Sequence, residues 1–303
     1  MITVASYAKI NWRLKILGRR LDGYHEIRTI FQTIDLSDQL SFEATTDPQI
    51  ELNITGRSVA AGSNNLVYRA AQKLKERARV RSGVRISLLK QIPVGAGLGG
   101  GSSNCAVALL ALNQLWKCNL KDQELMQLGA GLGSDVAFFF RGGTALGSGR
   151  GEQLLELPDD LPRTSLILLY PKFEIATKMA YGLGNWGLWE GEPVLTKQHL
   201  DNTIQRFQNA VKQGWLSSDY LENDFEDVLL RRYTRLAEAG ESLTDAGCER
   251  VMLCGSGSTL LGMAQPEQIE AIARAISERQ IGEVFLCHTL SRNEYEALGI
   301  FHL

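Results

Sequence analysis

A glycine-rich segment at residues 93–104, PVGAGLGGGSSN, constrains this chain more than any other feature of its sequence. Five of the seven residues from Gly95 to Gly101 are glycine, so backbone N–H groups can turn inward with no Cβ atom in the way. Ser102, Ser103 and Asn104 follow and can begin a helix, whose N-terminal dipole favours an anion. The segment therefore predicts a polyphosphate-binding loop.

The segment differs from two well-known phosphate-binding loops. A Walker A loop ends in Gly-Lys-Ser/Thr, and no lysine precedes Ser102. The dinucleotide fingerprint GxGxxG is met by Gly95, Gly97 and Gly100, but it usually follows the first strand of a domain, and about 90 residues precede this loop. A nicotinamide-dependent oxidoreductase is therefore a distant alternative.

Hydrophobic periodicity predicts strands and helices along the whole chain. Strands are expected at residues 27–34, 40–54, 84–89, 164–170, 250–253, 259–264 and 283–288. Helices are expected at residues 66–75, 102–116, 201–213, 224–239 and 266–279. Residues 158–162, PDDLP, form the expected linker because two prolines and two aspartates break any element. The sequence thus predicts two α+β domains, residues 1–157 and 158–303.

Composition excludes several classes of protein. The 303 residues are 44% hydrophobic and 22% charged, which is ordinary for a globular protein. The net charge of −2 favours neither nucleic acid nor a membrane surface, and no run approaches the roughly 20 apolar residues that cross a bilayer. Five scattered cysteines and four histidines indicate reduced thiols and no metal site. We expect a cytoplasmic protein, as a monomer or weak homodimer.

The glycine-rich segment resembles the second motif of the GHMP kinases, which include galactose, homoserine, mevalonate and phosphomevalonate kinases. Its triple glycine followed by SSN is typical of the diphosphocytidyl-methylerythritol kinases among them. Residues 8–11 (AKIN) and 18–26 (GRRLDGYHE) resemble the first motif and its continuation, and residues 255–258 (GSGS) resemble the third. Residues 133–136 (GSDV) are similar to the catalytic-aspartate segment, and residues 223–226 (NDFE) also match. The resemblance covers nearly the whole chain, in order.

This resemblance implies a fold and a reaction. The N-terminal domain is expected to be ribosomal S5 domain-2-like and the C-terminal domain ferredoxin-like, with two ligands meeting in the cleft between them. The implied activity is phosphorylation of an alcohol by ATP with Mg²⁺, and the implied acceptor is the cytidine-diphosphate derivative of methylerythritol, phosphorylated at its 2-hydroxyl. No protein ligand of Mg²⁺ is predicted.

Two charged residues are expected to carry the reaction. Phosphoryl transfer to a hydroxyl needs an acceptor for the proton and neutralisation of charge. By resemblance, Asp135 accepts the proton and Lys9 lowers the hydroxyl pKa and stabilises developing charge. On local sequence alone, Asp135 could equally cap a turn and Lys9 could lie on an edge strand.

The other expected site residues divide between the two ligands. The resemblance assigns to ATP the residues Asn65, Lys90, Pro93, Gly95, Gly97, Gly99, Gly100, Gly101, Ser102 and Ser103. It assigns to the acceptor the residues Asn11, Tyr24, His25, Thr177 and Tyr181. Tyr24 and Tyr181 would stack on the two faces of cytosine and His25 would bond its edge. Arg150 is a further candidate, for the acceptor's diphosphate.

Two other members of the superfamily stay open as alternatives. A kinase for a smaller alcohol such as mevalonate or homoserine would not need Tyr24 and His25. A non-catalytic, ligand-binding member would lack Lys9 or Asp135, and both are present. Residues 182–200 are longer than is usual in the family, and Trp186 and Trp189 have no counterpart that the resemblance can assign.

Overall fold

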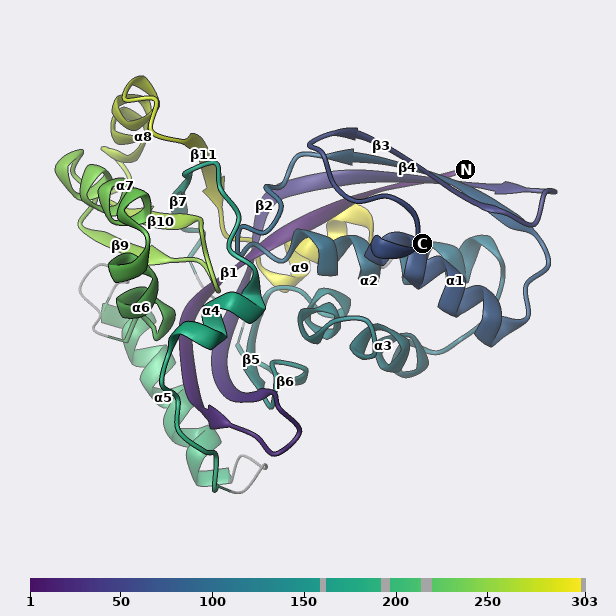
Figure 1. Cartoon of the computed structure of the whole chain (residues 1–303), viewed down its shortest axis with the longest axis horizontal. Coiled ribbons are helices and arrows are strands. Elements are labelled where there is room, and N and C mark those ends of the chain that lie inside the picture. The colour runs from purple at the N-terminus through teal and green to yellow at the C-terminus, as the bar shows by residue number, and fades with distance from the viewer. Residues whose placement is uncertain (159–161, 192–196, 214–219, 301–303) are drawn as a thin grey trace.

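The computed structural model describes residues 1–158, 162–191, 197–213 and 220–300, which form two β-sheets with helices packed against them (Figure 1). The seven strands of the first sheet are β1 (Ile2–Arg19), β2 (His25–Thr45), β3 (Ile50–Gly56), β4 (Gly83–Lys90), β5 (Thr144–Ser148), β6 (Gln153–Glu156) and β8 (Glu222–Asn223). The four strands of the second are β7 (Ser165–Tyr170), β9 (Arg250–Leu253), β10 (Leu260–Met263) and β11 (Glu283–His288).

Three helices from the N-terminal part of the chain accompany the first sheet, which also includes β8 from the C-terminal part. The sheet order is β3-β4-β2-β1-β8, with β5 paired to β2 and β6 to β5. The helices are α1 (Leu66–Ala78), α2 (Gly100–Leu115) and α3 (Asp122–Ala130), followed by a 3-10 helix, Ser134–Phe140. Helix α1 buries Val67, Ala70, Ala71 and Leu74, whose spacing of three and four places them on one face. The glycine-rich loop lies between the end of β4 and the start of α2, and so connects this sheet to α2.

The second sheet has the order β11-β7-β10-β9, and the helices lie between its strands in the chain. They are α4 (Thr177–Leu183), α5 (Lys197–Gln213), α6 (Phe225–Arg232), α7 (Thr234–Asp245) and α8 (Ile269–Glu278). This order is that of a ferredoxin-like sheet, and the predicted fold class is confirmed. Strand β7 is buried on both faces, because Leu166 and Leu168 pack with Trp12 of β1 whereas Ile167 and Leu169 belong to the other core.

The end of the chain returns to the N-terminal half, where α9 (Arg292–Tyr295) lies near α2 (Figure 1). The backbone N–H of Leu290 donates to Thr33, and the hydroxyl of the buried Tyr295 donates to the carbonyl of Phe139 at 2.7 Å. Residues from the far end of the sequence therefore complete the first core. The division after residue 157 stays a prediction, and residues 159–161 of the predicted linker lie outside the described residues.

Three predicted elements are divided differently in the structure. The predicted strands 27–34 and 40–54 have the wrong bounds, because β2 runs without a break from His25 to Thr45 and β3 begins at Ile50. Pro48 lacks an N–H, and the Asp47 carboxylate accepts from Gln49 N at 3.0 Å, which fixes a turn. The predicted helix 224–239 is two helices, because Tyr233 is extended and packs against Phe173.

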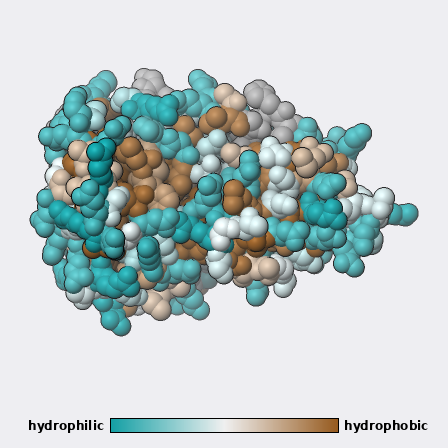
Figure 2. Space-filling model, turned by 90° about the horizontal axis from the view of Figure 1, so that it is seen from above, coloured by the Kyte–Doolittle hydropathy of each residue, from teal (hydrophilic) through white to brown (hydrophobic). Residues whose placement is uncertain are grey.

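The surface is largely hydrophilic where Figure 2 views it, and hydrophobic residues form separate patches among polar ones. Among residues 1–158, 162–191, 197–213 and 220–300, we find no helix with the length and hydrophobicity that a bilayer crossing requires.

Candidate active site

A cleft of about 1290 Å³ is lined by β1, the glycine-rich loop, the β1–β2 hairpin and the start of α4. Sites for one small ligand have volumes of about 300–1,000 Å³, so this cleft has room for two ligands. Of the expected site residues, it brings together Lys9, Asn11, Tyr24, His25, Asn65, Lys90, Pro93, Gly95, Gly97, Gly99, Gly100, Gly101, Ser102, Asp135, Thr177 and Tyr181. Ser103 lies beneath the loop, fully buried, and its hydroxyl accepts from Ser6 at 2.7 Å.

The loop needs glycine for its backbone angles and for its close contacts. Gly95, Gly97 and Gly99 have φ values of 60°, 79° and 69°, which L side chains rarely adopt. A Cβ on Gly97 would collide with the carbonyl of Cys254, and one on Gly99 would lie 2.9 Å from the Lys9 side chain. Helix α2 begins at Gly100, two residues earlier than expected, so its N-terminus opens on the cleft. This geometry suits a polyphosphate.

A buried carboxylate that sequence reasoning missed lies beneath the loop. Asp38 of β2 accepts from Lys90 Nζ at 2.5 Å and from Asn104 Nδ2 at 2.9 Å. It also accepts from the backbone N–H groups of Gln91 and Ile92, at 2.6 and 2.9 Å. Burial lowers the pKa of Lys90, and the Asp38 charge opposes that shift. The Asp38 carboxylate thus fixes β4, the loop and α2 to one another.

Two of the residues expected to contact ATP, Lys90 and Asn65, already have polar partners in the protein. Lys90 is 3% exposed and its ammonium meets Asp38. Asn65 caps α1, since its Oδ1 accepts from Val67 N at 2.9 Å and its Nδ2 donates to the Ala60 carbonyl at 2.8 Å. Both line the cleft, so each can shape the nucleotide pocket, and their contacts with ATP stay predictions.

The two expected reacting groups meet at the centre of the cleft. Lys9 Nζ lies 3.5 Å from Asp135 Oδ2, and the side chains are 5% and 31% exposed. Lys9 also donates to Asn11 Oδ1 at 2.8 Å, and Asn11 Nδ2 donates to Thr29 Oγ1 at 2.6 Å. Lys9 is therefore no surface lysine of an edge strand. The carboxylate is open to a ligand while the ammonium is fixed behind it.

The loop of residues 255–258 closes the site from the C-terminal half. A Cβ on Gly255 would lie 3.2 Å from Lys9 Nζ. Asn223 Nδ2 donates to the carbonyls of Leu253 and Gly255, both at 2.8 Å, which holds this loop in place. The hydroxyls of Ser256 and Thr177 are 3.0 Å apart. The segments NDFE and GSGS, far apart in the expected pattern, thus form one wall.

The part of the cleft that holds the residues expected to bind the acceptor, here called the acceptor end, is aromatic and cationic. Tyr24 is 53% exposed, and the Arg150 guanidinium lies 4.7 Å from its ring centroid, a cation–π contact. The rings of His25 and Tyr181 are stacked, with centroids 4.5 Å apart and planes 13° apart. Burial, and then the charge of Arg19, lowers the pKa of His25, which favours the neutral imidazole at pH 7. His25 covers one face of Tyr181 here, so the proposed roles of the three rings stay predictions.

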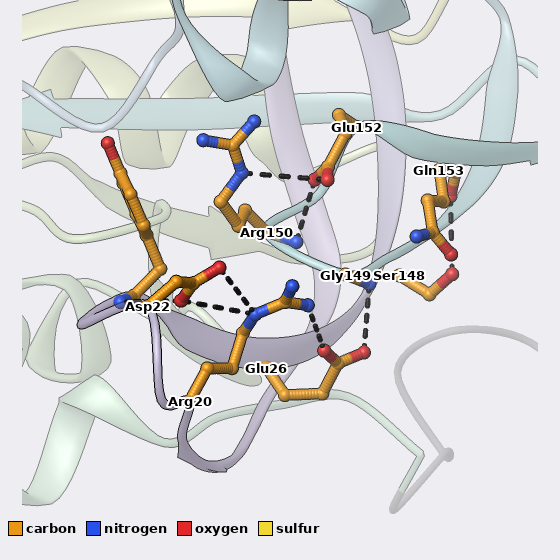
Figure 3. A network of polar contacts seen from close by, with 9 residues as sticks. Arg20, Asp22, Glu26, Ser148, Gly149, Arg150, Glu152 and Gln153 are labelled. Carbon is orange, nitrogen blue, oxygen red and sulfur yellow. Dashed lines mark hydrogen bonds and ion pairs between the residues drawn. The ribbon is translucent and has the colours of Figure 1, made fainter. Parts of the chain in front are cut away.

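A polar network holds the hairpin that carries Tyr24 and His25 (Figure 3). The buried carboxylate of Glu26 accepts from Arg20 at 2.7 Å and from the N–H of Gly149 at 3.0 Å. Glu152 accepts from the N–H of Arg150 at 2.7 Å, within the turn between β5 and β6. Glu26 thus ties the hairpin to the turn that carries Arg150, a role that no local sequence signal indicated.

The cleft suits a magnesium ion that is bound mainly by phosphate oxygens better than one that is bound by protein side chains alone. No group of three or more His, Cys, Asp or Glu suited to a metal occurs among the residues that the structure describes. The described carboxylates that line the cleft are Asp22 and Asp135. Asp22 is paired with Arg20 and Asp135 with Lys9. Mg²⁺ needs only one or two protein ligands where phosphate oxygens and water supply the rest, so a single oxygen donor such as the Ser102 hydroxyl, which lines the cleft, fits.

Comparisons with known proteins identify the family to which the chain belongs. The family descriptions "GHMP kinases N terminal domain" and "GHMP kinases C terminal" match residues 65–143 and 195–281. A 4-diphosphocytidyl-2-C-methyl-D-erythritol kinase of Moorella thermoacetica is 40% identical over 279 residues, covering 92% of this chain and 94% of the relative.

Solved structures distinguish the close family from the wider fold. A crystal structure of a 4-(cytidine 5′-diphospho)-2C-methyl-D-erythritol kinase has a TM-score of 0.77 and 32% identity, over 95% of this chain and 99% of that one. Homoserine kinase from Cytophaga hutchinsonii, at 18% identity and a TM-score of 0.65 over 96% and 95% of the two chains, shares the fold. The chain is a small-molecule kinase that belongs to the GHMP kinases and, among them, to the 4-diphosphocytidyl-2-C-methyl-D-erythritol kinase family.

Proposed function

We propose that this enzyme transfers the γ-phosphoryl group of ATP to the 2-hydroxyl of 4-diphosphocytidyl-2-C-methyl-D-erythritol, a step of the non-mevalonate route to isoprenoid precursors. The observation that carries the proposal is the composition of one cleft. An anion-binding loop occupies one end, the Lys9–Asp135 pair the centre, and Tyr24, His25, Tyr181 and Arg150 the other end. A smaller alcohol would leave that aromatic end unused.

The reacting groups fit an in-line transfer. Asp135 would accept the proton of the 2-hydroxyl as its oxygen attacks, because its carboxylate is exposed to the cleft. Lys9, fixed by Asn11 and 3.5 Å from Asp135, would stabilise the negative charge that develops at the transferring group. Backbone N–H groups of residues 95–101 and the start of α2 would hold the β- and γ-phosphates.

Magnesium would be held mainly by the phosphate oxygens of ATP, with Ser102 as a protein contact beside the loop. When bound, it neutralises phosphate charge during the transfer. This role needs few protein ligands, and it leaves Asp135 paired with Lys9 and Asp22 paired with Arg20.

Each acceptor residue has a part in the proposal. Tyr24 and Tyr181 would offer aromatic faces to cytosine, and neutral His25 would bond the base edge. Arg150, above Tyr24, would meet the diphosphate. Asn11 and Thr177, which line the cleft near the reacting pair, would contact the methylerythritol part. A cytoplasmic location and the oligomeric state stay predictions.

The test is an ADP-release assay with ATP and Mg²⁺ and three separate acceptors: the cytidine-diphosphate compound, mevalonate and homoserine. We expect turnover with the first acceptor. With the other two, kcat/KM should be lower by several orders of magnitude, because mevalonate and homoserine lack the groups that would pair with the polar residues of the acceptor end. A higher kcat/KM with mevalonate or homoserine would contradict the proposal.

A further inference from the structure

Residues 184–189, here called the Trp186 segment, follow α4 and dock on the edge of β1. The N–H of Arg19 donates to the Gly187 carbonyl, and the N–H of Trp189 donates to the Arg19 carbonyl, both at 2.8 Å. Gly18 permits this approach, because a Cβ there would lie 2.9 Å from Trp189 N. The segment is therefore held against the strand that carries Lys9 and leads into the hairpin.

Trp186 connects this segment to the acceptor end. Its indole N–H donates to the carbonyl of Tyr181 at 2.8 Å. Trp186 and Tyr181 both pack edge-on against Phe225, with ring centroids 5.9 and 4.9 Å away. A Cβ on Gly184 would collide with the indole, so glycine at this position lets the ring fold back. These contacts restrain Tyr181 through its backbone and through its ring.

The restrained ring is the one that stacks on His25, at 4.5 Å. Trp186 itself lines the cleft, as do Asn185 and Leu188 of the same segment. A tryptophan that only filled a core would contribute to stability and would act equally on both ligands. Trp186 instead contacts a residue of one ligand site, which predicts an effect on that ligand alone.

We propose that Trp186 is a positioning residue of the acceptor site. It holds Tyr181 against Phe225, so that the stacked pair of Tyr181 and His25 is fixed before the base of a nucleoside-diphosphate acceptor binds. A surface fixed before binding spares the loss of side-chain freedom that binding would otherwise require. This inference rests on the proposed function, since it concerns the same acceptor end.

The test compares Trp186→Ala and Trp186→Phe with a matched pair, Trp116→Ala and Trp116→Phe. The Trp116 indole also donates to a backbone carbonyl, that of Gly83 at 3.3 Å, and it lies at the end of α2 remote from the loop. Binding of cytidine 5′-diphosphate is measured by calorimetry, and KM for ATP and kcat by ADP release. Circular dichroism measures folding.

We expect cytidine 5′-diphosphate to bind about 10- to 100-fold more weakly to Trp186→Ala and about 3- to 10-fold more weakly to Trp186→Phe. The ATP KM should stay within about twofold, and the Trp116 variants should bind like the parent. Should Trp186→Ala fail to fold, the phenylalanine variant decides. Parental binding by a folded Trp186 variant overturns this inference alone, whereas a parent that binds no cytidine 5′-diphosphate overturns the proposed function with it.

Discussion

The two ends of the cleft are built differently. At the phosphate-loop end, the side chains beneath the loop are buried and pair inside the protein, as Asp38 does with Lys90, Asn104 and two backbone N–H groups. At the acceptor end, Tyr24 and Arg150 are partly exposed, and rings from distant segments meet at His25 and Tyr181. The first end suits a ligand common to many kinases, and the second suits a particular base.

Because the two ends are built differently, they should tolerate substitutions differently. A buried charged group has a high energetic cost when it loses its partner. Substitutions at the loop end should therefore lower the stability of the protein and raise the ATP KM together. Exposed aromatic contacts contribute mainly to binding. Substitutions at the acceptor end should therefore change acceptor affinity and leave the fold and the ATP KM almost unaltered.

The largest expected effect lies between the two ends, at the reacting pair. Asp135→Asn keeps the shape and removes the base, so kcat should fall by about 10²–10⁴ with little change in ATP KM. Lys9→Ala should lower kcat by about 10²–10³. Because the groups are 3.5 Å apart and act together, the double variant should lose less than the product of the single losses. Steady-state kinetics of the four enzymes measures this, and near-normal turnover in Asp135→Asn would show that another base acts.

Removal of the buried partner at the loop end should have the next largest effect. Asp38→Asn leaves the Lys90 ammonium buried without its counter-ion and should reduce the free energy of unfolding by about 3–5 kcal/mol, with a raised ATP KM. Asp38→Asn with Lys90→Met removes both charges and should lose less stability than the single change. Urea unfolding measures both. Equal losses in the single and double variants would contradict the buried-pair explanation.

Loss of one exposed aromatic ring should have a smaller effect, confined to the acceptor. Tyr24→Ala should weaken acceptor binding by about 1–3 kcal/mol, a 5- to 150-fold rise in acceptor KM when chemistry is slow. The ATP KM should change little, and Tyr24→Phe, which keeps the ring beneath Arg150, should resemble the parent. The acceptor and ATP KM values are measured side by side. A rise in the ATP KM alone would show that Tyr24 contacts ATP and not the acceptor, which would contradict the assignment.

The loop end was largely predictable from the sequence because its five glycines lie within seven residues that lead directly into a helix. Asp38 was missed because its partners lie 52 to 66 residues away and it sits between the predicted strands 27–34 and 40–54, among other polar residues. The helix break at Tyr233 likewise depends on a contact with Phe173, which no local pattern encodes. The turn at Asp47 and Pro48, in contrast, could have been predicted, because aspartate and proline are typical of turns.

The residues of the acceptor end were predictable only as separate sequence motifs. Tyr24 and His25 were named from residues 18–26, yet the stack of His25 on Tyr181 joins positions from opposite halves of the chain. Glu26 was visible as a glutamate in that string, but its contact with Gly149 forms only when the turn between β5 and β6 reaches the hairpin. Residue types were therefore predictable, whereas pairings required the fold.

The smallest expected effect is the pH dependence of the acceptor end. Burial holds the pKa of His25 below 6.5, so the folded protein favours the neutral imidazole. At pH values between the pKa of His25 in the folded protein and 6.5, the unfolded chain binds more protons than the folded protein does. The contribution of His25 to stability is therefore complete above pH 6.5 and falls as the pH drops. If the neutral ring bonds the base edge, acceptor KM should be flat above pH 6.5.

Acceptor KM should then rise by at most about tenfold between pH 6.5 and pH 5, with the midpoint of the rise below pH 6.5. His25→Gln, which cannot gain a proton, should remove this rise, whereas the ATP KM of both enzymes serves as the control for general acid effects. The profile separates the two ends because the loop end contributes no histidine among the described residues of the cleft. An unchanged acid rise in His25→Gln would assign it to another group and would leave His25 as a stacking partner of Tyr181.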